Sequence, residues 1–311
     1  MITRRPCRLV PGNGFRRWRR YLRITVRGLI ALVGVMALGL GWEAYRTRLQ
    51  RRAVGTIRAA DGSVKYNWQW RNGEPVRDAK PPAPQQIVEF VGVDHFGTVK
   101  AVELFPRSRP VRDFSAEDRA NLEFALDSVK TLPQVEHVNL AASRVNDGEL
   151  AKLNGVKTIN HLGLNWTEIG DAGLEQLAGL PNLKRLSLHR APITDAGLVH
   201  LRKFPKLTGL YLGYTRVTDA GLVNLAGLGR LSKLDLSGTE VSDLGLAHLK
   251  GLAGLTSLKL SKTKVTDAGQ VHLRGLTYLV YLEVCETRVT RYGAHELEQC
   301  LPSVTIRRRY Y

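Results

Sequence analysis

Hydrophobic residues follow a 24-residue pattern over the second half of the chain. Each copy begins with the frame LxxLxL, whose alternating last leucines predict a short strand with one buried face. A string close to TDAGL follows, and leucines then recur at every third position, which predicts a short amphipathic helix. One strand and one helix cannot bury their apolar faces alone. Stacked copies with a continuous shared core are therefore expected.

Seven copies stand in one register over residues 135–306, which include a closing segment at the end. The string at the helix start is, in order, NDGEL, GDAGL, TDAGL, TDAGL, SDLGL, TDAGQ and TRYGA. This repetition resembles the leucine-rich-repeat family, in the TDAGL variant seen in bacterial membrane-anchored proteins. The resemblance implies an α/β solenoid, with a curved parallel β-sheet on the concave face and short helices on the convex face. The family's Asn or Cys is mostly Thr here, whose hydroxyl can also bind turn backbone.

An aspartate occupies the same place in six of the seven repeats, and in five of them it precedes the dipeptide AG or LG. A carboxylate at a helix start accepts free backbone N–H groups and meets the positive end of the helix dipole. We therefore interpret these residues as structural helix caps and not as catalytic groups. The glycine two positions later is expected to let the helix backbone approach the neighbouring repeat closely. The predicted caps are Asp171, Asp195, Asp219, Asp243 and Asp267.

The charge of the chain is concentrated at its start. Residues 1–60 contain 14 Arg, no Lys and one acid, Glu43, and carry +13 of the net +18. Nine of these arginines precede an uncharged run, residues 28–42, which we interpret as the core of a transmembrane anchor. Fifteen helical residues span about 22 Å of a hydrocarbon core of about 30 Å, so a span of 22–45 is possible with flanking residues. A cleaved signal peptide and a soluble protein with a basic hydrophobic arm are the alternatives.

The excess of arginine before the run predicts the orientation. We expect a single-pass protein of the plasma (inner) membrane, with the N-terminus cytoplasmic, the repeats outside, and the arginine cluster and N-terminal helix in contact with membrane lipid. The predicted parts are an Arg-rich cytoplasmic segment (1–27), the transmembrane core (28–42), a juxtamembrane helix and strand (43–70), a Pro-rich linker (71–86), an N-terminal cap with a degenerate first strand (87–134), seven repeats with a C-terminal cap (135–306) and a basic tail (307–311).

The sequence contains no recognised catalytic motif. It has no P-loop, no strand-linked GxGxxG, no HExxH and no GxSxG, so we expect no enzyme activity, no cofactor and no small-molecule substrate. Its three cysteines are odd in number and widely spaced, which argues against a disulfide scaffold. His137 and His161 fall in one strand column, but two imidazoles without a third ligand make a poor metal site, so no metal is expected.

The outward positions of the strands and of the turns after them form columns across the repeats. One column places Arg190 between Trp166 and Tyr214, where cation–π stacking is available, with Arg185, His189 and Tyr211 nearby. Aromatic and Arg clusters of this kind are enriched in interface hot spots. We predict these six residues to be partner-binding, the alternative being that they merely cover the sheet.

Taken together, these features predict a membrane-anchored, non-enzymatic scaffold that binds an unidentified protein on its concave face. The alternative is a binder of nucleic acid, anionic polymer or lipid through the Arg-rich arm. Residues 61–306 carry a net charge of only +2. A nucleic-acid interface on the folded body is therefore not expected.

Overall fold

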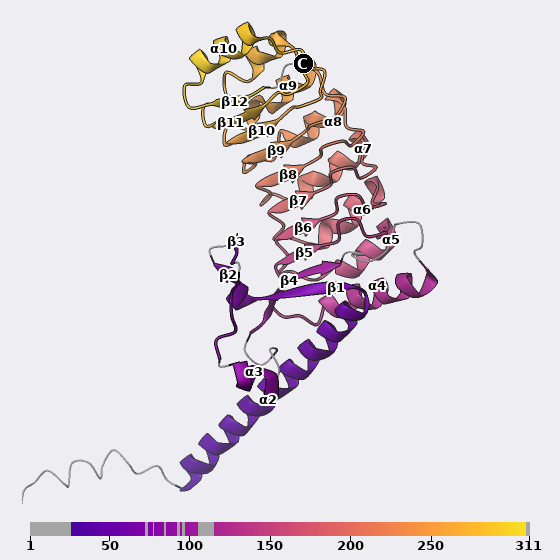
Figure 1. Cartoon of the computed structure of the whole chain (residues 1–311), viewed down its shortest axis with the longest axis vertical. Helices are drawn as coiled ribbons and strands as arrows, with labels where there is room; N and C mark the ends of the chain where they lie inside the picture. The colour runs from indigo at the N-terminus through magenta and orange to yellow at the C-terminus, as the bar shows by residue number, and fades with distance from the viewer. Residues whose placement is uncertain are drawn as a thin grey trace, which may run out of the picture. The chain divides into compact units, whose positions relative to one another are not determined.

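The computed structural model describes residues 26–71, 74–76, 78–83, 85–91, 94, 97–104 and 115–308 (Figure 1). Most of the predicted Arg-rich segment, and with it the alternative function of the basic arm, lies outside the described residues, as does the end of the basic tail. The chain divides into two compact units, residues 1–48 and 49–311. Each unit is described by itself.

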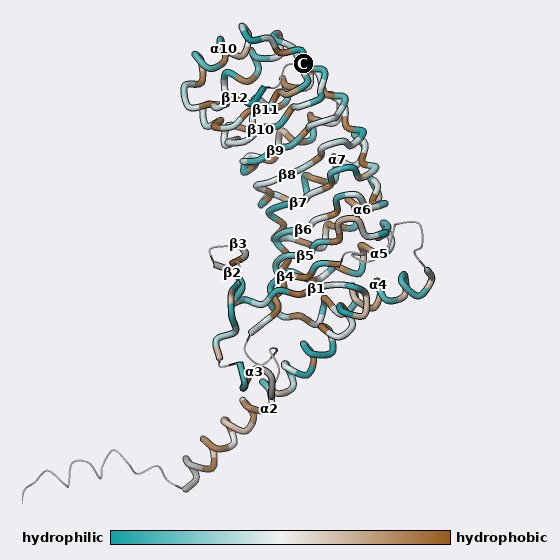
Figure 2. The backbone as a smooth tube through the Cα atoms, viewed as in Figure 1, coloured by the Kyte–Doolittle hydropathy of each residue, from teal (hydrophilic) through white to brown (hydrophobic). Residues whose placement is uncertain are grey.

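The long helix α2 (Val26–Ala59) begins in the first unit and ends in the second. Figure 2 shows a hydrophobic stretch, coloured brown, in this helix. Its large side chains are exposed, as with Ile30 at 66%, Leu38 at 76% and Trp42 at 61%. Within the described part of the chain, no helix has both the length and the apolar character needed to cross a membrane. The predicted transmembrane helix is therefore not shown.

The second unit opens with a cap that closes the N-terminal end of its core. Helix α2 ends at Ala59, and in the turn after it Asp61 adopts a φ of 55°. A Cβ on Gly62 would lie 2.5 Å from Leu104 Cδ2 and 2.6 Å from the Ile57 carbonyl oxygen, so only glycine fits this turn. Strand β1 (Gly62–Tyr66) then pairs antiparallel with β4 (Val99–Leu104), which is the degenerate first strand expected from the sequence.

Two predictions for the cap need correction. The strand expected to run through Trp70 stops at Tyr66, whose N–H donates to Gln69 Oε1 as the chain enters the 3₁₀ helix η1 (Asn67–Gln69). The segment 71–86, predicted to be a linker, contains part of a small sheet. The remaining elements of the cap are β2 (Trp70–Arg71), β3 (Glu74–Pro75), α3 (Gln85–Val91) and α4 (Ala116–Val129).

The seven repeats form the expected solenoid, with strands on one side and short helices on the other (Figure 1). Strands β4 to β12 are parallel and pair in chain order, with β1 antiparallel at the edge of this ten-stranded sheet. Repeats 1 to 7 are numbered here by their strands, which are β5 (His137–Asn139), β6 (His161–Gly163), β7 (Arg185–Ser187), β8 (Gly209–Tyr211), β9 (Lys233–Asp235), β10 (Ser257–Lys259) and β11 (Tyr281–Glu283).

In repeats 1 to 5 the helical side combines a short α-helix with a 3₁₀ turn, whereas repeat 6 has a 3₁₀ helix alone and repeat 7 an α-helix alone. The helices are α5 (Asp147–Leu150) with η4 (Ala151–Leu153), α6 (Asp171–Gln176) with η5 (Leu177–Gly179), α7 (Asp195–Leu198) with η6 (Val199–Lys203), α8 (Asp219–Leu222) with η7 (Val223–Leu225), α9 (Asp243–Leu246) with η8 (Ala247–Gly251), η9 (Asp267–His272) and α10 (Arg291–Cys300). The last repeat is closed by β12 (Thr305–Arg307), whose Ile306 is half-buried against the apolar core, as a terminal cap requires. Arg307, predicted to begin the basic tail, is thus part of the sheet.

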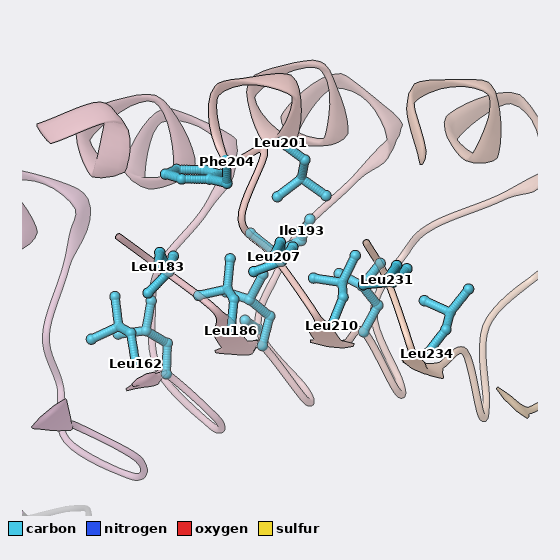
Figure 3. Packing of buried hydrophobic residues seen from close by; sticks show 14 of the residues in the cluster. Leu162, Leu183, Leu186, Ile193, Leu201, Phe204, Leu207, Leu210, Leu231 and Leu234 are labelled. Carbon is cyan, nitrogen blue, oxygen red and sulfur yellow. The ribbon is translucent and has the colours of Figure 1, made fainter. Parts of the chain in front are cut away.

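A single apolar core runs through the repeats between sheet and helices (Figure 3). The strand leucines, such as Leu186 and Leu210, and the helix leucines, such as Leu201, are fully buried. Phe204 takes the place of a leucine in repeat 3 and is equally buried. The predicted hydroxyl ladder is present, since Thr215 Oγ1, for example, donates to the Leu212 carbonyl at 2.6 Å.

The recurrent aspartates lie in the first helical turn, as predicted, but the N-cap of each of these helices is the residue before the aspartate. The N-cap of α8 is Thr218, whose hydroxyl accepts from the Ala220 N–H, and Asp219 occupies the first helical turn behind it. The carboxylate of Asp219 instead accepts from the backbone N–H and the hydroxyl of Ser242, the N-cap of the next repeat. The same bridge recurs from Asp171, Asp195, Asp243 and Asp267 to the following repeat.

The glycine of the repeat completes this bridge. A Cβ on Gly245 would lie less than 3.0 Å from Asp219 Oδ1, so the absence of a side chain creates the space for the carboxylate. The predicted close approach of neighbouring repeats is therefore correct, and its purpose is to admit the aspartate. The Asp and Gly of TDAGL act across successive repeats and not within one helix.

Candidate functional site

The parallel register aligns outward side chains of the sheet in columns, and this outward side is called the concave face below. His161 pairs with Arg185, and Arg185 with Gly209, along one column. Ser187 pairs with Tyr211 along the next. The order of side chains on the concave face is therefore the order expected from the sequence.

A further column lies in the turns that leave the strands. Its residues all have positive φ, between 55° and 69°, in all seven repeats. A left-handed non-glycine residue costs about 1–2 kcal/mol, and here the turn is held by N–H groups that donate to the next repeat, such as that of Arg190 to the Gly213 carbonyl at 2.9 Å. The column consists of Ala142, Trp166, Arg190, Tyr214, Gly238, Lys262 and Glu286.

The predicted cation–π arrangement is present in this turn column. The guanidinium carbon of Arg190 lies 4.1 Å from the ring centre of Trp166 and 4.9 Å from that of Tyr214. Trp166 and Tyr214 are 56% and 38% exposed, so the sandwich faces solvent. His189 packs edge-on to Tyr214, with 5.0 Å between ring centres. These four residues, Trp166, His189, Arg190 and Tyr214, are called the aromatic–Arg cluster.

The environment of His189 keeps its ring neutral. Burial lowers the pKa of this imidazole below its usual value, against the opposing effect of Asp235. Its backbone N–H donates to Asn165 Oδ1 at 2.9 Å, which fixes the residue in the strand exit. Near neutral pH the cluster therefore carries one positive charge, that of Arg190.

Arg185 and Tyr211 are placed in a different part of the concave face. Both line a hollow of about 310 Å³ at the N-terminal half of the sheet, together with Ser187, His161 and Trp70. The six predicted site residues thus divide into two groups, four in the aromatic–Arg cluster and two in this hollow, called the Arg185 hollow. Their role in partner binding stays a prediction.

Sequence reasoning missed the wall of the Arg185 hollow. Trp70 stacks on His137 with 4.3 Å between ring centres, and His137 stacks on His161 at 4.2 Å. The two histidines were expected to be neighbours, but no local pattern could bring in a tryptophan 67 residues earlier. Burial, and then the charge of His137, lower the pKa of His161 to about 4, so its ring is neutral at pH 7.

Glycines of the concave face make room for the large side chains of the preceding repeat. A Cβ on Gly213 would lie 2.6 Å from His189 Nδ1, and one on Gly238 would lie 2.6 Å from Tyr214 Cδ1. A Cβ on Gly209 would lie 3.3 Å from Arg185 Cγ and 3.5 Å from Tyr211 Oη, so this glycine lies beneath both side chains. A glycine one repeat after a large outward residue is the signal by which the sequence could have revealed this packing.

A second hollow, of about 300 Å³, continues from the aromatic–Arg cluster toward repeat 7. It is lined by His189 and Tyr214 and by charged residues that pair with one another, such as Lys262 with Glu286 at 3.3 Å. Among the described residues, no group of three His, Cys, Asp or Glu side chains is placed to hold a metal ion.

The fold and the repeat spacing are similar to those of leucine-rich-repeat solenoids. A family model described as "Leucine Rich repeat" matches residues 157–178. An internalin C2 from Listeria monocytogenes has a similar structure, with a TM-score of 0.52 and 20% sequence identity over 83% of this chain and 92% of that chain. No curated protein sequence matches this chain.

Two other solved structures have lower TM-scores. An internalin (inlF) from the same Listeria strain gives 0.49 at 21% identity over 60% of this chain, and a leucine-rich-repeat protein of Leptospira interrogans gives 0.45 at 20% identity over 58%. This chain spans 50% and 44% of their respective lengths. The family model supports a leucine-rich repeat at residues 157–178, and the internalin C2 structure supports the solenoid fold.

Proposed function

We propose that this chain is a non-enzymatic scaffold that binds another protein through its concave face and the adjoining turn column. The observation that carries the proposal is the exposed sandwich of Arg190 between Trp166 and Tyr214. Tryptophan, tyrosine and arginine dominate the energetic hot spots of protein interfaces. Here the three are ordered before any partner arrives, which lowers the entropic cost of binding.

The bonding of Arg190 supports the same proposal. Its two faces are covered by aromatic rings, and its guanidinium makes no hydrogen bond or ion pair within the described part of the chain. The N–H groups along its edge are therefore available to a partner. In the later repeats, by contrast, cations of the concave face and turns are paired, as in Lys259 with Asp235 at 4.0 Å.

A photocross-linking experiment tests the proposal. The full chain carries a benzophenone amino acid at position 214 or, as a matched control on the helical side, at position 223, where Val223 is similarly exposed at 47%. Illumination in the native cell envelope should attach one distinct protein from position 214 and not from position 223. Adding Arg190→Ala should reduce that adduct several-fold. Equal adducts from both positions would contradict a binding site on the concave side.

We also propose that the exposed apolar stretch of α2 attaches the chain to the plasma (inner) membrane, with the N-terminus cytoplasmic and the repeats outside. The proposal rests on the flanking arginines and on the possible span of 22–45, which begins before the described residues. External protease added to intact cells should degrade a C-terminal tag. A tag that survives until the cells are lysed would place the repeats inside.

A further inference from the structure

The Arg185 hollow is chemically distinct from the aromatic–Arg cluster. Its floor is the sheet of repeats 1 to 4, and one wall is the stack of Trp70, His137 and His161. Gly163 and Gly209 lack side chains within this surface, and the larger residues of the preceding repeat lie over them. The hollow is therefore built by the N-terminal cap and the sheet together.

The polar groups of the hollow converge at Gly209. Arg185 Cγ and Tyr211 Oη both lie within 3.5 Å of the position of a Cβ on this glycine, so the guanidinium stem and the phenol are neighbours. Neither the Arg185 guanidinium nor the Tyr211 hydroxyl has a hydrogen-bond partner among the described residues. Trp70, on the same lining, has a buried indole N–H that also meets no acceptor there.

The charged lining of the hollow includes one carboxylate, Glu103, and the guanidinium of Arg185, whose donors have no partner among the described residues. Glu103, on its lining, is paired with Lys65 at 2.5 Å and accepts from Ser63. The ring of His161 is neutral, because burial and the charge of His137 lower its pKa. Arg185 remains as the cation with free donors, and a guanidinium binds a carboxylate through two parallel hydrogen bonds. A guanidinium that shares its hollow with the carboxylate of Glu103 fits a monoanion better than a dianionic phosphate, because Glu103 repels additional negative charge.

We propose that the Arg185 hollow is a carboxylate-binding subsite, in which Arg185 and Tyr211 hold a carboxylate of the partner protein. The proposal rests on the proposed function and names the chemical group that the partner presents. The carboxylate is that of an Asp or Glu side chain or of a chain terminus, and both carry the same monoanion.

Protection of Arg185 from chemical modification tests the subsite without knowledge of the partner. The full chain in non-ionic detergent is treated with phenylglyoxal, and the modification rate of each arginine is measured on its peptide by mass spectrometry. Acetate is the probe, acetamide is its neutral isostere, and sodium chloride controls for ionic strength. Acetate should slow the modification of Arg185 at least threefold, and acetamide and chloride should not. Arg216, exposed on a turn of the same solenoid, should be slowed equally little by all three.

Two variants locate the effect within the hollow. Tyr211→Phe removes one donor and should weaken the protection by acetate several-fold, whereas Tyr278→Phe, on an exposed tyrosine outside the hollow, should leave it unchanged. Equal protection in acetate and acetamide, or protection by inorganic phosphate alone, would overturn the carboxylate assignment.

Two further probes separate the possible sources of the carboxylate. Acetyl-glutamate amide carries only a side-chain carboxylate, and acetyl-alanine carries only a terminal one. Stronger protection by the first assigns the subsite to an acidic side chain, and stronger protection by the second assigns it to a chain terminus. A specific adduct from position 214 without any carboxylate protection of Arg185 would overturn the subsite and leave the proposed function standing.

Discussion

The bridge from Asp219 is one of five equivalent polar contacts between successive repeats, and its loss should destabilise the solenoid. Asp219→Ala removes a carboxylate that accepts from the Ser242 N–H at 2.7 Å and from its hydroxyl at 2.5 Å. Hydrogen bonds to a charged group contribute about 1.5–3 kcal/mol each. Because Asp219 is half-buried, water can replace part of the lost hydrogen bonding. We therefore expect Asp219→Ala to lower the free energy of unfolding by about 2–3 kcal/mol.

Gly245→Ala should lower the free energy of unfolding by a similar amount, because it adds a clashing group where Asp219→Ala removes hydrogen bonds. The new methyl group would lie less than 3.0 Å from Asp219 Oδ1 and 3.0 Å from Leu222 Cδ1. This clash must exceed the gain of about 1 kcal/mol that alanine brings over glycine in a helix. In the double variant the clashing oxygen is absent, and the remaining contact with the movable end of the Leu222 side chain is offset by the helix preference of alanine. We therefore expect Gly245→Ala to be nearly neutral in the Asp219→Ala background, with a coupling energy of about 2 kcal/mol.

Urea unfolding of the full chain in non-ionic detergent, followed by circular dichroism, measures this cycle. Gly227→Ala is the matched control, since nothing lies within 4 Å of its added Cβ, and it should change the free energy of unfolding by less than about 0.5 kcal/mol. If the summed effects of the two single variants equal the effect of the double variant to within about 0.5 kcal/mol, Gly245 does not serve to make room for Asp219.

Three further outcomes are expected. Thr239→Val should destabilise the chain by about 1–2 kcal/mol, because it leaves the buried Leu236 carbonyl without its hydroxyl donor, and Thr239→Ser should restore most of the loss in urea unfolding. The pKa of His161 is lowered to about 4 in the folded chain, so between about pH 6.5 and pH 4 the unfolded chain binds a proton that the folded chain does not. The free energy of unfolding should therefore fall as the pH drops through this range. His161→Gln should reduce this fall, measured between pH 7 and pH 4.5, by about 1 kcal/mol after solvent screening. Gly213→Ala should displace the His189 ring and weaken formation of the adduct at position 214. The free energy of unfolding should change by less than about 1 kcal/mol, because the clash falls on a movable ring. Unchanged adduct formation would contradict a role of the His189 ring in partner binding.

Much of the recognition surface followed from spacing alone. A 24-residue period in a parallel sheet places equivalent residues side by side, which is why the sandwich of Arg190 could be predicted before its geometry was known. The left-handed conformation of the turn column could not be predicted from the sequence. Trp166, Arg190 and Tyr214 are unusual residues for a positive φ, and within the column only Gly238 indicates this conformation. The ladder of hydrogen bonds between repeats holds this conformation against the local preference of each residue.

The sequence by itself determined the repeat, its register, the buried leucines and the order of side chains on the concave face, because each is a consequence of local periodicity. Tertiary structure alone decided which groups meet across repeats and across the cap. The recurrent aspartates sit at helix starts in the sequence, yet their carboxylates bind the next repeat, since the neighbouring glycine opens a space that no single repeat contains. Likewise, Trp70 joins His137 because the small sheet after β1 returns over repeat 1, a contact between residues far apart in the chain that local patterns do not encode.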